Sequence, residues 1–482
     1  MTISRRRCLA VAAAALAAGP AVAEKVLEVG NAVEQHGVVI VGSGLAGLSA
    51  AAGALENGAD SVLILEKGPL IGGHSQYSSG SIAAVLPKAM QPAQGWQDSV
   101  EQFVADALAV GEGLGNADLL VKIASDSYDA LMWLQSCGIY YGPVFTAKSG
   151  VHPRCYAMPG NSAGRSYVLA LARHVRTLGA AVRLNSRVTD FERVANGWLV
   201  RVEQTKESRR IHRTILANSL VIASGGFTAD IARRMRIDAR LTADVHTTAN
   251  PYGTVWDGAD AEVLSIAQSI GAAVTDRFGL QLLPYWGGRL LDYDGGDIYV
   301  DSTGQRFVNE ALPWNAVADK ILNLENRSCW VITDARSHKG ATLGLKLING
   351  IVFKVDSIEE MAEKMGVPSV ILKKTLDKYN ESYEKGYDAD TGRRVFAQRI
   401  EKPPFYFGRE TIYVHTTLDG IRTDDKARVL TQSGNPMPGL FAAGEVVGGI
   451  FGKDRLGGAG MTNCLVMGRE AGRNAARNAS VS

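Results

Sequence analysis

The segment Val38–Gly47 reads VVIVGSGLAG and joins four consecutive apolar residues to a glycine-rich turn. An apolar run without alternation is typical of a parallel strand that is buried on both faces. An Ala-rich helix to about Asn57 follows, and then a second apolar strand, Ser61–Leu65, which ends at Glu66. The order of strand, glycine turn, helix and strand predicts an α/β fold with a doubly wound parallel sheet.

The glycines of this turn have the spacing of a dinucleotide-binding fingerprint. Gly42 permits the tight turn, Gly44 lets a pyrophosphate approach the backbone, and Gly47 lets the helix pack on the strand. The N-terminus of the helix would hold the diphosphate through its free N–H groups and its dipole. Glu66 is placed to accept hydrogen bonds from ribose hydroxyls. The unit therefore predicts a dinucleotide cofactor.

The cofactor fold takes its elements from both ends of the sequence. Ser219–Phe227 and Pro438–Glu445 each have the pattern of a buried strand that ends in a glycine turn. The middle of the chain, from about Phe278 to Arg409, is richer in aromatic, proline and charged residues, and Ile358–Lys385 has helical periodicity. We interpret this middle part as an inserted α+β capping domain, because a substrate site needs walls that the sheet alone does not supply.

The first residues have the composition of an export signal. Arg5–Arg7 form a charged region, Ala10–Ala18 a short apolar region, and Ala21–Ala23 a small-residue cleavage site. The apolar run is too short for a stable membrane anchor. The paired arginines resemble a twin-arginine (Tat) signal, with an ordinary Sec signal as the alternative. The mature protein would begin near Glu24 and lie in the periplasm. We therefore expect four segments: the export signal 1–23, the first part of the cofactor-binding domain 24–277, the capping domain 278–409, and the second part of the cofactor-binding domain 410–482.

Composition and cysteine spacing argue against a nucleic-acid-binding surface, a covalently bound haem and a zinc site. The net charge of +2 argues against a nucleic-acid surface, which needs clustered Lys and Arg. Gly accounts for 53 of the 482 residues, above the average of roughly 7%. The cysteines beyond the signal show no CxxC, no CxxCH for covalent haem and no zinc spacing. No metal site is therefore expected, and electrons would come from a separate carrier.

Several motifs resemble the flavoprotein family of fumarate reductase and succinate dehydrogenase. These motifs are Val41–Gly47, Glu66-Lys67, Ile71–His74, Ala223–Phe227, Gly304–Glu310, Gly444–Gly449 and Arg455–Gly458. The chain is most similar to the soluble periplasmic branch that includes flavocytochrome c fumarate reductase and urocanate reductase. This resemblance implies a glutathione-reductase-like FAD domain that is interrupted by a mobile capping domain.

The resemblance also implies which residues bind FAD. They are Gly42, Gly44, Ala46, Gly47, Glu66, Lys67, Gly72, Gly73, His74, Ser75, Val188, Ser224, Gly225, Asp257, Gly444, Glu445 and Gly460. His74, six residues before Gly80, has the spacing of the histidine that carries covalent FAD in membrane-bound succinate dehydrogenases. The alternative for His74 is a hydrogen-bond donor to the cofactor.

The family reaction moves a hydride between the flavin and a C–C bond next to a carboxylate, and a protein acid handles the second proton. Arg455 matches the arginine that holds the substrate carboxylate, a role for which a guanidinium is suited. Where fumarate reductases have a catalytic arginine after the RFVNE motif, this chain has Trp314 at or beside that position. The substrate histidine of a His-Pro-Thr segment matches Leu283 in Leu283-Pro284-Tyr285, and of a His-His-Thr segment only His415 is kept.

These departures predict a site for a larger, less charged or aromatic molecule, with another proton donor. The candidates are Tyr285, Tyr293, Tyr252 and His415. We expect an FAD-dependent oxidoreductase acting on a C–C bond next to a carboxylate or ketone of a small organic molecule. It would be a reductase fed by a separate cytochrome c or flavin protein. Pro313-Trp314 also resembles ketosteroid dehydrogenases, which act on ring ketones and use tyrosines as acid and base. A third alternative is a flavin-bearing protein without catalysis.

Overall fold

The computed structural model describes residues 33–93, 95–147, 150–159, 163–287, 290–291, 293–340 and 342–480. The side chains of residues 163 and 285–287 also lie outside the description, although their backbone is part of it. The expected signal 1–23 lies outside the described residues. None of the helices within these ranges combines the length and apolar character of a membrane span.

The larger sheet carries the predicted parallel core. Its strand order is β14-β15-β8-β1-β2-β5. The pairs β1–β2, β1–β8, β8–β15 and β2–β5 are parallel, and only β14 runs antiparallel at the edge. The strands are β1 (Glu34–Val41), β2 (Val62–Leu65), β5 (Ala181–Arg183), β8 (Arg209–Ile222), β14 (Arg428–Leu430) and β15 (Pro436–Ala442). The predicted α/β fold is therefore confirmed.

Strands from distant parts of the chain lie in register at the centre of this sheet. Ile40 is opposite Val221 on one side and Ile64 on the other, and Phe441 is opposite Val221. The exposed fraction of Ile40 is 0%, as expected for a strand that is covered on both faces. The carboxyl ends of β1, β8 and β15 therefore meet at one edge, where α/β folds bind their ligands.

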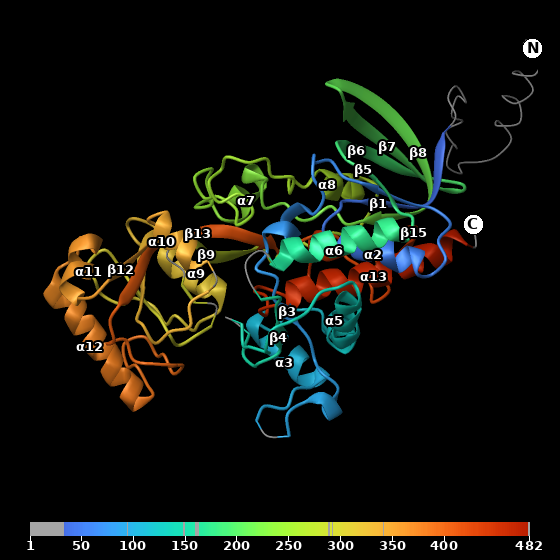
Figure 1. Cartoon of the computed structure of the whole chain (residues 1–482). Helices are drawn as coiled ribbons and strands as arrows, with labels where there is room; N and C mark the ends of the chain where they lie inside the picture. Colours follow the sequence, from blue (N-terminus) through green and yellow to red (C-terminus); the bar gives the residue numbers. More distant parts are fainter. Residues whose placement is uncertain are drawn as a thin grey trace, which may run out of the picture.

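Two small-residue helices pack closely on one face of the sheet. These are α2 (Leu45–Leu55), which follows the glycine turn, and α13 (Ala459–Ala479), which closes the described chain. Figure 1 shows them side by side, α2 in blue and α13 in red. A Cβ atom at Gly472 would lie 1.9 Å from the carbonyl oxygen of Ala50. Glycine is therefore needed for the close approach that joins the two ends of the chain.

Several further elements surround this core. The antiparallel strands β6 (Ser186–Val194) and β7 (Gly197–Lys206) extend the sheet from β8. The remaining helices and strands before the second sheet are α3 (Val100–Val110), α4 (Ala117–Ser125), α5 (Ser127–Ser136), α6 (Ala163–Thr177), α7 (Ile231–Ile237), α8 (Glu262–Ser269), β3 (Ile82–Ala83) and β4 (Cys155–Tyr156). The described 3₁₀ helices are η1 (Gly73–Tyr77), η2 (Lys88–Met90) and, after β15, η3 (Gly444–Val446).

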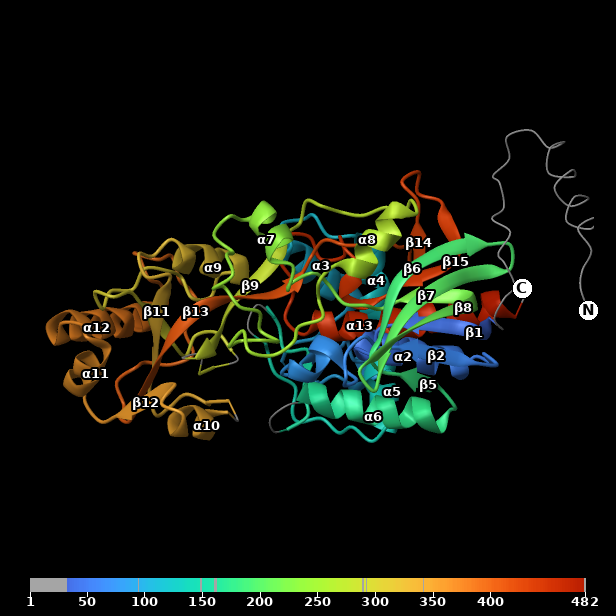
Figure 2. The same cartoon turned by 90° about the horizontal axis from the view of Figure 1, so that it is seen from above.

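The middle of the chain builds a second sheet away from the first. Its order is β10-β11-β13-β12, with β9 paired to β13. Figure 2 shows this sheet and its helices to one side, joined to the larger sheet through β9 and β13. The elements are β9 (Leu280–Gly287), β10 (Ile298–Val300), β11 (Ser328–Thr333), β12 (Val352–Val355), β13 (Phe405–Thr417), α9 (Trp314–Leu322), α10 (Leu343–Ile348), α11 (Ile358–Met365) and α12 (Ser369–Lys385).

Two details differ from the sequence-based expectation for this region. The helical pattern of Ile358–Lys385 forms two helices, because Gly366 adopts a left-handed conformation with φ of +71° and Pro368 follows it. The expected boundary between 409 and 410 falls inside β13, which runs on towards the larger sheet. The domain division stays a prediction.

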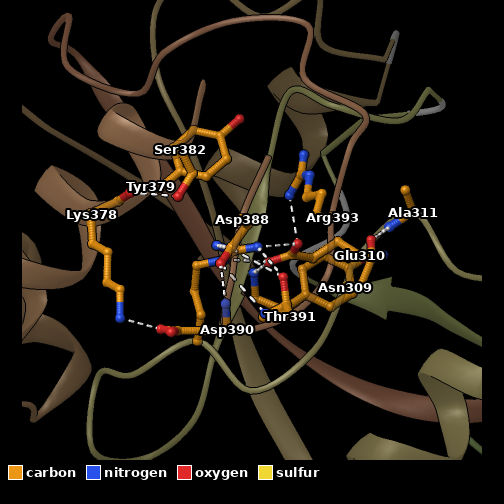
Figure 3. A network of polar contacts seen from close by, with 12 residues as sticks. Asn309, Glu310, Ala311, Lys378, Tyr379, Ser382, Asp388, Asp390, Thr391 and Arg393 are labelled. Carbon is orange, nitrogen blue, oxygen red and sulfur yellow. Dashed lines mark hydrogen bonds and ion pairs between the residues drawn. The ribbon is translucent and has the colours of Figure 1, made fainter. Parts of the chain in front are cut away.

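A buried network of charges joins the segment between β10 and α9 to the segment that follows α12. Glu310 accepts hydrogen bonds from Arg306 Nε at 2.9 Å, from Arg393 Nη1 at 2.5 Å and from the backbone N–H of Tyr299 at 3.0 Å. Arg306 also pairs with Asp388. Figure 3 shows Glu310 and Arg393 facing each other, with Asp388 beside them. The RFVNE motif (Arg306–Glu310) therefore holds the chain in place at Glu310, which lies four residues before Trp314.

Candidate functional site

A cavity of about 360 Å³ lies at the carboxyl edge of the larger sheet. We call it the dinucleotide cavity. Of the residues predicted to bind FAD, it is lined by Gly42, Gly44, Ala46, Glu66, Lys67, Gly73, His74, Ser75, Val188, Ser224, Gly225, Asp257 and Glu445. Segments from both ends of the chain therefore form one site.

The glycine turn has the shape that the fingerprint requires. Gly42 has a φ of +105°, and a Cβ atom there would lie 2.3 Å from the carbonyl oxygen of Ala223. A Cβ atom at Gly47 would lie 2.0 Å from the carbonyl oxygen of Gly42. At Gly44, by contrast, the nearest atom to such a Cβ is Ser75 Oγ at 3.6 Å. Gly44 is thus free of close protein neighbours on the side of the cavity, which leaves room for a diphosphate at the start of α2.

The other predicted glycines serve packing rather than lining of this cavity. A Cβ atom at Gly72 would lie 2.8 Å from Val168, and one at Gly444 would lie 2.6 Å from the Cβ of Ala46. Both glycines have positive φ angles. They bring the η1 and η3 segments close to the glycine turn.

Glu66 closes the turn as well as lining the cavity. Its Oε2 accepts hydrogen bonds from the N–H of Ser43 at 3.0 Å and from Ser43 Oγ at 2.6 Å, and its Oε1 accepts from the N–H of Gly68 at 2.7 Å. Its carboxylate therefore already holds two loops in place. Contact with a ribose stays a prediction.

His74 and Asp257 form a pair where the dinucleotide cavity meets a second cavity. His74 Nε2 lies 2.6 Å from Asp257 Oδ1, and Thr247 Oγ1 donates to Asp257 Oδ2 at 2.7 Å. Burial opposes the protonation of His74, but the hydrogen bond and charge of Asp257, with the charge of Glu445, raise its pKa. Burial opposes ionisation of Asp257, and the pairing with His74 outweighs it and lowers the pKa to about 2. The pairing therefore favours the imidazolium form of His74 and the carboxylate form of Asp257.

The second cavity has a volume of about 210 Å³ and we call it the arginine cavity. It shares His74, Ser75, Tyr77, Ala249, Glu445 and Cys464 with the dinucleotide cavity, so that the two adjoin. Gly460 lines it, and a Cβ atom at Gly460 would lie 2.0 Å from Arg455 Nη1. The guanidinium of Arg455 therefore packs directly against the first turn of α13.

Arg455 is a cation without an ion pair in the described part of the chain. Its Nη2 donates to Gln281 Oε1 at 3.1 Å, and its Nε is buried with no hydrogen-bond partner among the described residues. Burial lowers the pKa of Arg455, and the negative charges of Glu445 and Asp454 oppose that shift. A buried cation with an unused donor is costly unless an anion completes it. This arrangement suits a carboxylate ligand.

A buried polar cluster positions Arg455 relative to α9 and β9. Gln281 Nε2 donates to Asp454 Oδ1 at 2.6 Å, and the N–H of Asn315 donates to Asp454 Oδ2 at 2.9 Å. Asn315 Nδ2 donates to the carbonyl oxygen of Lys453 at 2.7 Å. The loop that carries Arg455 is thus tied to the residue that follows Trp314.

The departures from the family pattern meet in the arginine cavity. Leu283, Trp314, His415 and Thr416 all line it. The exposed fraction of Leu283 is 4% and that of Trp314 is 5%. His415 Nδ1 lies 2.9 Å from Thr248 Oγ1. Leu283 and Trp314, which the resemblance matches to two polar residues of the family, thus place apolar side chains in this cavity.

Two of the predicted tyrosines, Tyr252 and Tyr293, do not line the arginine cavity. Tyr293 lines a separate cavity of about 1150 Å³ together with Pro313 and His338, and its hydroxyl accepts a hydrogen bond from the N–H of His338 at 3.1 Å. Tyr252 is 58% exposed. The side chain of Tyr285 lies outside the described residues. Among the four candidate proton donors, His415 is thus the one whose described side chain lines the same cavity as Arg455.

Three residues of the site were not predicted from the sequence. Gln281 holds Arg455, and Asn463 lines the arginine cavity with a buried Oδ1 that has no partner among the described residues. Trp256 lines the dinucleotide cavity, is 60% exposed and lies beneath Lys67 Nζ, 5.7 Å from the ring centre. Trp256 stands directly before Asp257-Gly258, and an exposed tryptophan beside a predicted cofactor residue is the signal that could have found it.

Comparisons with known proteins agree with this geometry. The FAD binding domain family matches residues 37–461. A protein of Shewanella frigidimarina named probable fumarate reductase is 31% identical over 96% of this chain and 77% of its own length. The acrylate reductase flavoprotein subunit of Shewanella woodyi is 31% identical over 90% of each chain.

Solved structures share the fold. The open conformation of a flavocytochrome c3 fumarate reductase has a TM-score of 0.73 and 27% identity, over 99% of this chain and 82% of that one. A 3-ketosteroid dehydrogenase from Rhodococcus jostii has a TM-score of 0.71 over 94% of this chain and 99% of that one, and its 22% identity shows a likeness of fold alone. The FAD expected from the glycine turn is thus supported by the family match, the shape of the turn and the adjoining cavities. This chain belongs to the FAD-binding family of fumarate reductase flavoproteins and is an FAD-dependent oxidoreductase.

Proposed function

We propose that this protein is an exported reductase of a carbon–carbon double bond next to a carboxylate, and that a separate protein supplies its electrons. The observation that carries the proposal is Arg455, a guanidinium without an ion pair among the described residues, in a cavity that adjoins the dinucleotide cavity. The similarity to a probable fumarate reductase and an acrylate reductase subunit supports the direction of reduction.

In this proposal Arg455 binds the carboxylate of the substrate and polarises the conjugated double bond. A guanidinium can hold a carboxylate through two parallel hydrogen bonds, which also fixes its orientation. Gln281 holds the guanidinium near the start of α13, and Asp454 accepts a hydrogen bond from the backbone N–H of Arg455 at 2.7 Å. The N-terminus of this helix adds a favourable dipole for an anion.

The second requirement is a proton for the carbon that does not receive the hydride. Bound FAD supplies hydride chemistry. His415 delivers the proton in this proposal, because its ring lines the arginine cavity and Thr248 fixes its orientation through Nδ1. The apolar side chains of Leu283 and Trp314 exclude water, which strengthens the electrostatic contribution of Arg455.

Export and electron supply rest on the sequence. Residues 1–23 have the pattern of a signal, with the twin-arginine pair, and the chain carries no CxxCH motif for a haem of its own. A periplasmic cytochrome c or flavin protein would then donate the electrons. Mass spectrometry of periplasmic protein from expressing cells, with a mature N-terminus near Glu24, tests the location.

The central test is anaerobic oxidation of reduced methyl viologen by unsaturated carboxylic acids with the FAD-loaded enzyme. We expect Arg455→Met to lower kcat/KM for the best acid by at least about 100-fold. The substitution removes the positive charge that stabilises the negative charge of the substrate in the transition state. The unfolding temperature should not fall, because the variant removes a buried cation without a counter-charge.

Arg469→Met is the matched control. Arg469 lies on α13, the helix that follows the loop with Arg455, and it pairs with Glu56 at 3.1 Å and packs over Trp133. It should keep its activity. Equal activity of Arg455→Met and the wild type would exclude the carboxylate role.

Dehydrogenation of a ring ketone is the second candidate. The apolar wall at Leu283 and Trp314 favours it, as does the shared fold with the ketosteroid enzyme. Under this alternative a saturated 3-ketosteroid would bleach the oxidised flavin anaerobically, and Arg455→Met would leave the bleaching rate unchanged.

A further inference from the structure

The arginine cavity contains a single permanent cation among its described lining residues. This cation is Arg455. Two histidines also line the cavity, but His74 is paired with Asp257 at 2.6 Å and His415 is hydrogen-bonded to Thr248 at 2.9 Å. One negative charge of a ligand can therefore be matched at Arg455, and the described residues offer no second permanent positive charge in this cavity.

One part of the cavity wall is apolar and buried, whereas Ser78, Ser79, Ser81, Thr416 and Thr417 line other parts. Its apolar members include Leu283, Trp314, Leu418, Ile450 and Phe451. Each of these five is less than 10% exposed. A second carboxylate placed against this wall would lose its water and gain no counter-charge, which costs several kcal/mol at other buried sites. An aromatic or aliphatic group placed there would instead be favoured by burial.

Trp314 is held in this wall by its neighbours. The N–H of the next residue, Asn315, donates to Asp454 Oδ2 at 2.9 Å, and Asn315 Oδ1 accepts from the N–H of Leu282 at 2.8 Å. The start of α9 is thus tied both to the Arg455 loop and to β9, which carries Leu283. Arg455, Trp314 and Leu283 are thus linked through one hydrogen-bonded cluster. This cluster opposes the rearrangement of the wall that a charged group would require.

We propose that the substrate is a 2-enoate with one carboxylate and an uncharged, apolar or aromatic group on C3, and that Trp314 and Leu283 exclude dicarboxylates. This inference rests on the proposed function and names its substrate class. The reaction adds one hydride and one proton across the C2–C3 double bond and yields the saturated monocarboxylic acid. The two electrons come from the external donor, which is reduced methyl viologen in the test.

The binding arm of the experiment decides this inference without turnover. Saturated acids, 3-phenylpropanoate and succinate, are titrated into the oxidised FAD-loaded enzyme, and the change in flavin absorbance gives the two dissociation constants. We expect 3-phenylpropanoate to bind at least about 100-fold more tightly, as sites that leave a polar group unmatched commonly discriminate by this factor or more. Succinate binding within tenfold of 3-phenylpropanoate, or binding of neither acid up to the solubility limit, overturns the inference.

The turnover arm decides the proposed function separately. Cinnamate, crotonate and fumarate are each supplied with reduced methyl viologen. Reduction of cinnamate or crotonate with little reduction of fumarate supports both proposals. Preferred reduction of fumarate overturns the substrate class and leaves the reductase in place, whereas reduction of none of a wider panel of enoates overturns the reductase itself.

Two variants test the part played by Trp314. Trp314→Arg adds a second cation to the wall, and we expect the preference for 3-phenylpropanoate over succinate to narrow by at least about tenfold. Trp314→Phe is the matched control, because it keeps a neutral aromatic ring and should keep the preference. If Trp314→Arg does not retain FAD, the ratio of the two dissociation constants in the wild type and in Trp314→Phe still tests the inference. Loss of the preference for 3-phenylpropanoate in Trp314→Phe overturns the assignment of this preference to an uncharged wall.

Discussion

His415 is the single residue on which the proton transfer depends in the proposed reaction. It lines the arginine cavity, and its Nδ1 is held by Thr248 Oγ1 at 2.9 Å. We expect His415→Gln to lower kcat by about 10²–10⁴-fold, the usual contribution of a general acid. The dissociation constant of a saturated acid should change little, since Arg455 provides the anion contact. Steady-state kinetics and flavin titration measure the two quantities, and unchanged kcat would move the proton donor to another residue.

The pair of His74 and Asp257 makes stability depend on pH in a defined direction. The folded pKa of His74 is raised above its ordinary 6.5, so its contribution is complete below pH 6.5 and is lost as the pH rises through the raised value. The folded pKa of Asp257 is lowered to about 2 from 3.8, so its contribution is complete above pH 3.8 and is lost as the pH falls towards 2. A charged hydrogen bond of this kind contributes about 1.5–3 kcal/mol.

We therefore expect His74→Gln to reduce the unfolding temperature most between pH 5 and pH 6.5. The gap to the wild type should shrink at higher pH, because the wild-type imidazole then loses its proton. Thermal melts at half-unit pH steps measure the gap, with His212→Gln in an exposed part of β8 as the control. A gap that stays constant up to pH 9 would contradict the assigned ion pair.

At the scale of elements, the ion network around Glu310 joins the segment between β10 and α9 to the segment that follows α12. Burial opposes ionisation of Glu310, and the charges of Arg393 and Arg306 keep its pKa low. We expect Glu310→Gln to lower the free energy of unfolding by about 3–5 kcal/mol, since it leaves two buried guanidinium groups without their shared counter-charge. Urea unfolding followed by fluorescence measures this change. Glu381→Gln is the control, because Glu381 pairs with Lys385 on the exposed face of α12 and its loss should have little effect.

Elements with strong local signals could be predicted from the sequence. The apolar runs of β1 and β2 and those at the ends of β8 and β15 were predicted as strands, and all of them form in the expected sheet. The region Ile358–Lys385 shows the weakness of periodicity, because Gly366 changes the backbone direction without interrupting the pattern. The pairing of β9 with β13 could not be predicted, since it joins strands more than a hundred residues apart and depends on tertiary packing.

The residues of the candidate site could be predicted only where they belong to a recognisable sequence motif. Arg455 and His415 follow from the family pattern, and the structure places both in one cavity. Gln281 and Asn463 carry no local signal, because their importance comes from buried contacts with Arg455 and the cavity. Tyr293 was a reasonable candidate by residue type, but the chain turns it into a different cavity.

On the scale of the whole molecule, the cofactor site combines parts of the chain that lie far apart in the sequence. The dinucleotide cavity is lined by residues from β1, the η1 segment, β6 and the η3 segment. We expect FAD to raise the unfolding temperature of the apoprotein, with about 2.7 kcal/mol of stabilisation at a free concentration of 100 times Kd. Since His74 Nε2 is hydrogen-bonded to Asp257, we also expect the flavin to leave with the supernatant when the protein is denatured. Calorimetry with and without FAD, and the colour of the precipitate, measure these outcomes; a yellow pellet would instead indicate a covalent bond.

The central position of β8, between β1 and β15, affects when the protein can complete its fold during synthesis on the ribosome. The glycine turn is synthesised early, but Glu445 and Cys464 of the same cavity are synthesised much later. At about 5–20 residues per second, the glycine turn waits roughly 20–80 seconds for these residues. Complete capture of the flavin therefore has to wait until Glu445 and Cys464 have left the ribosome, and a translocase that carries only folded, loaded molecules would suit such a late maturation.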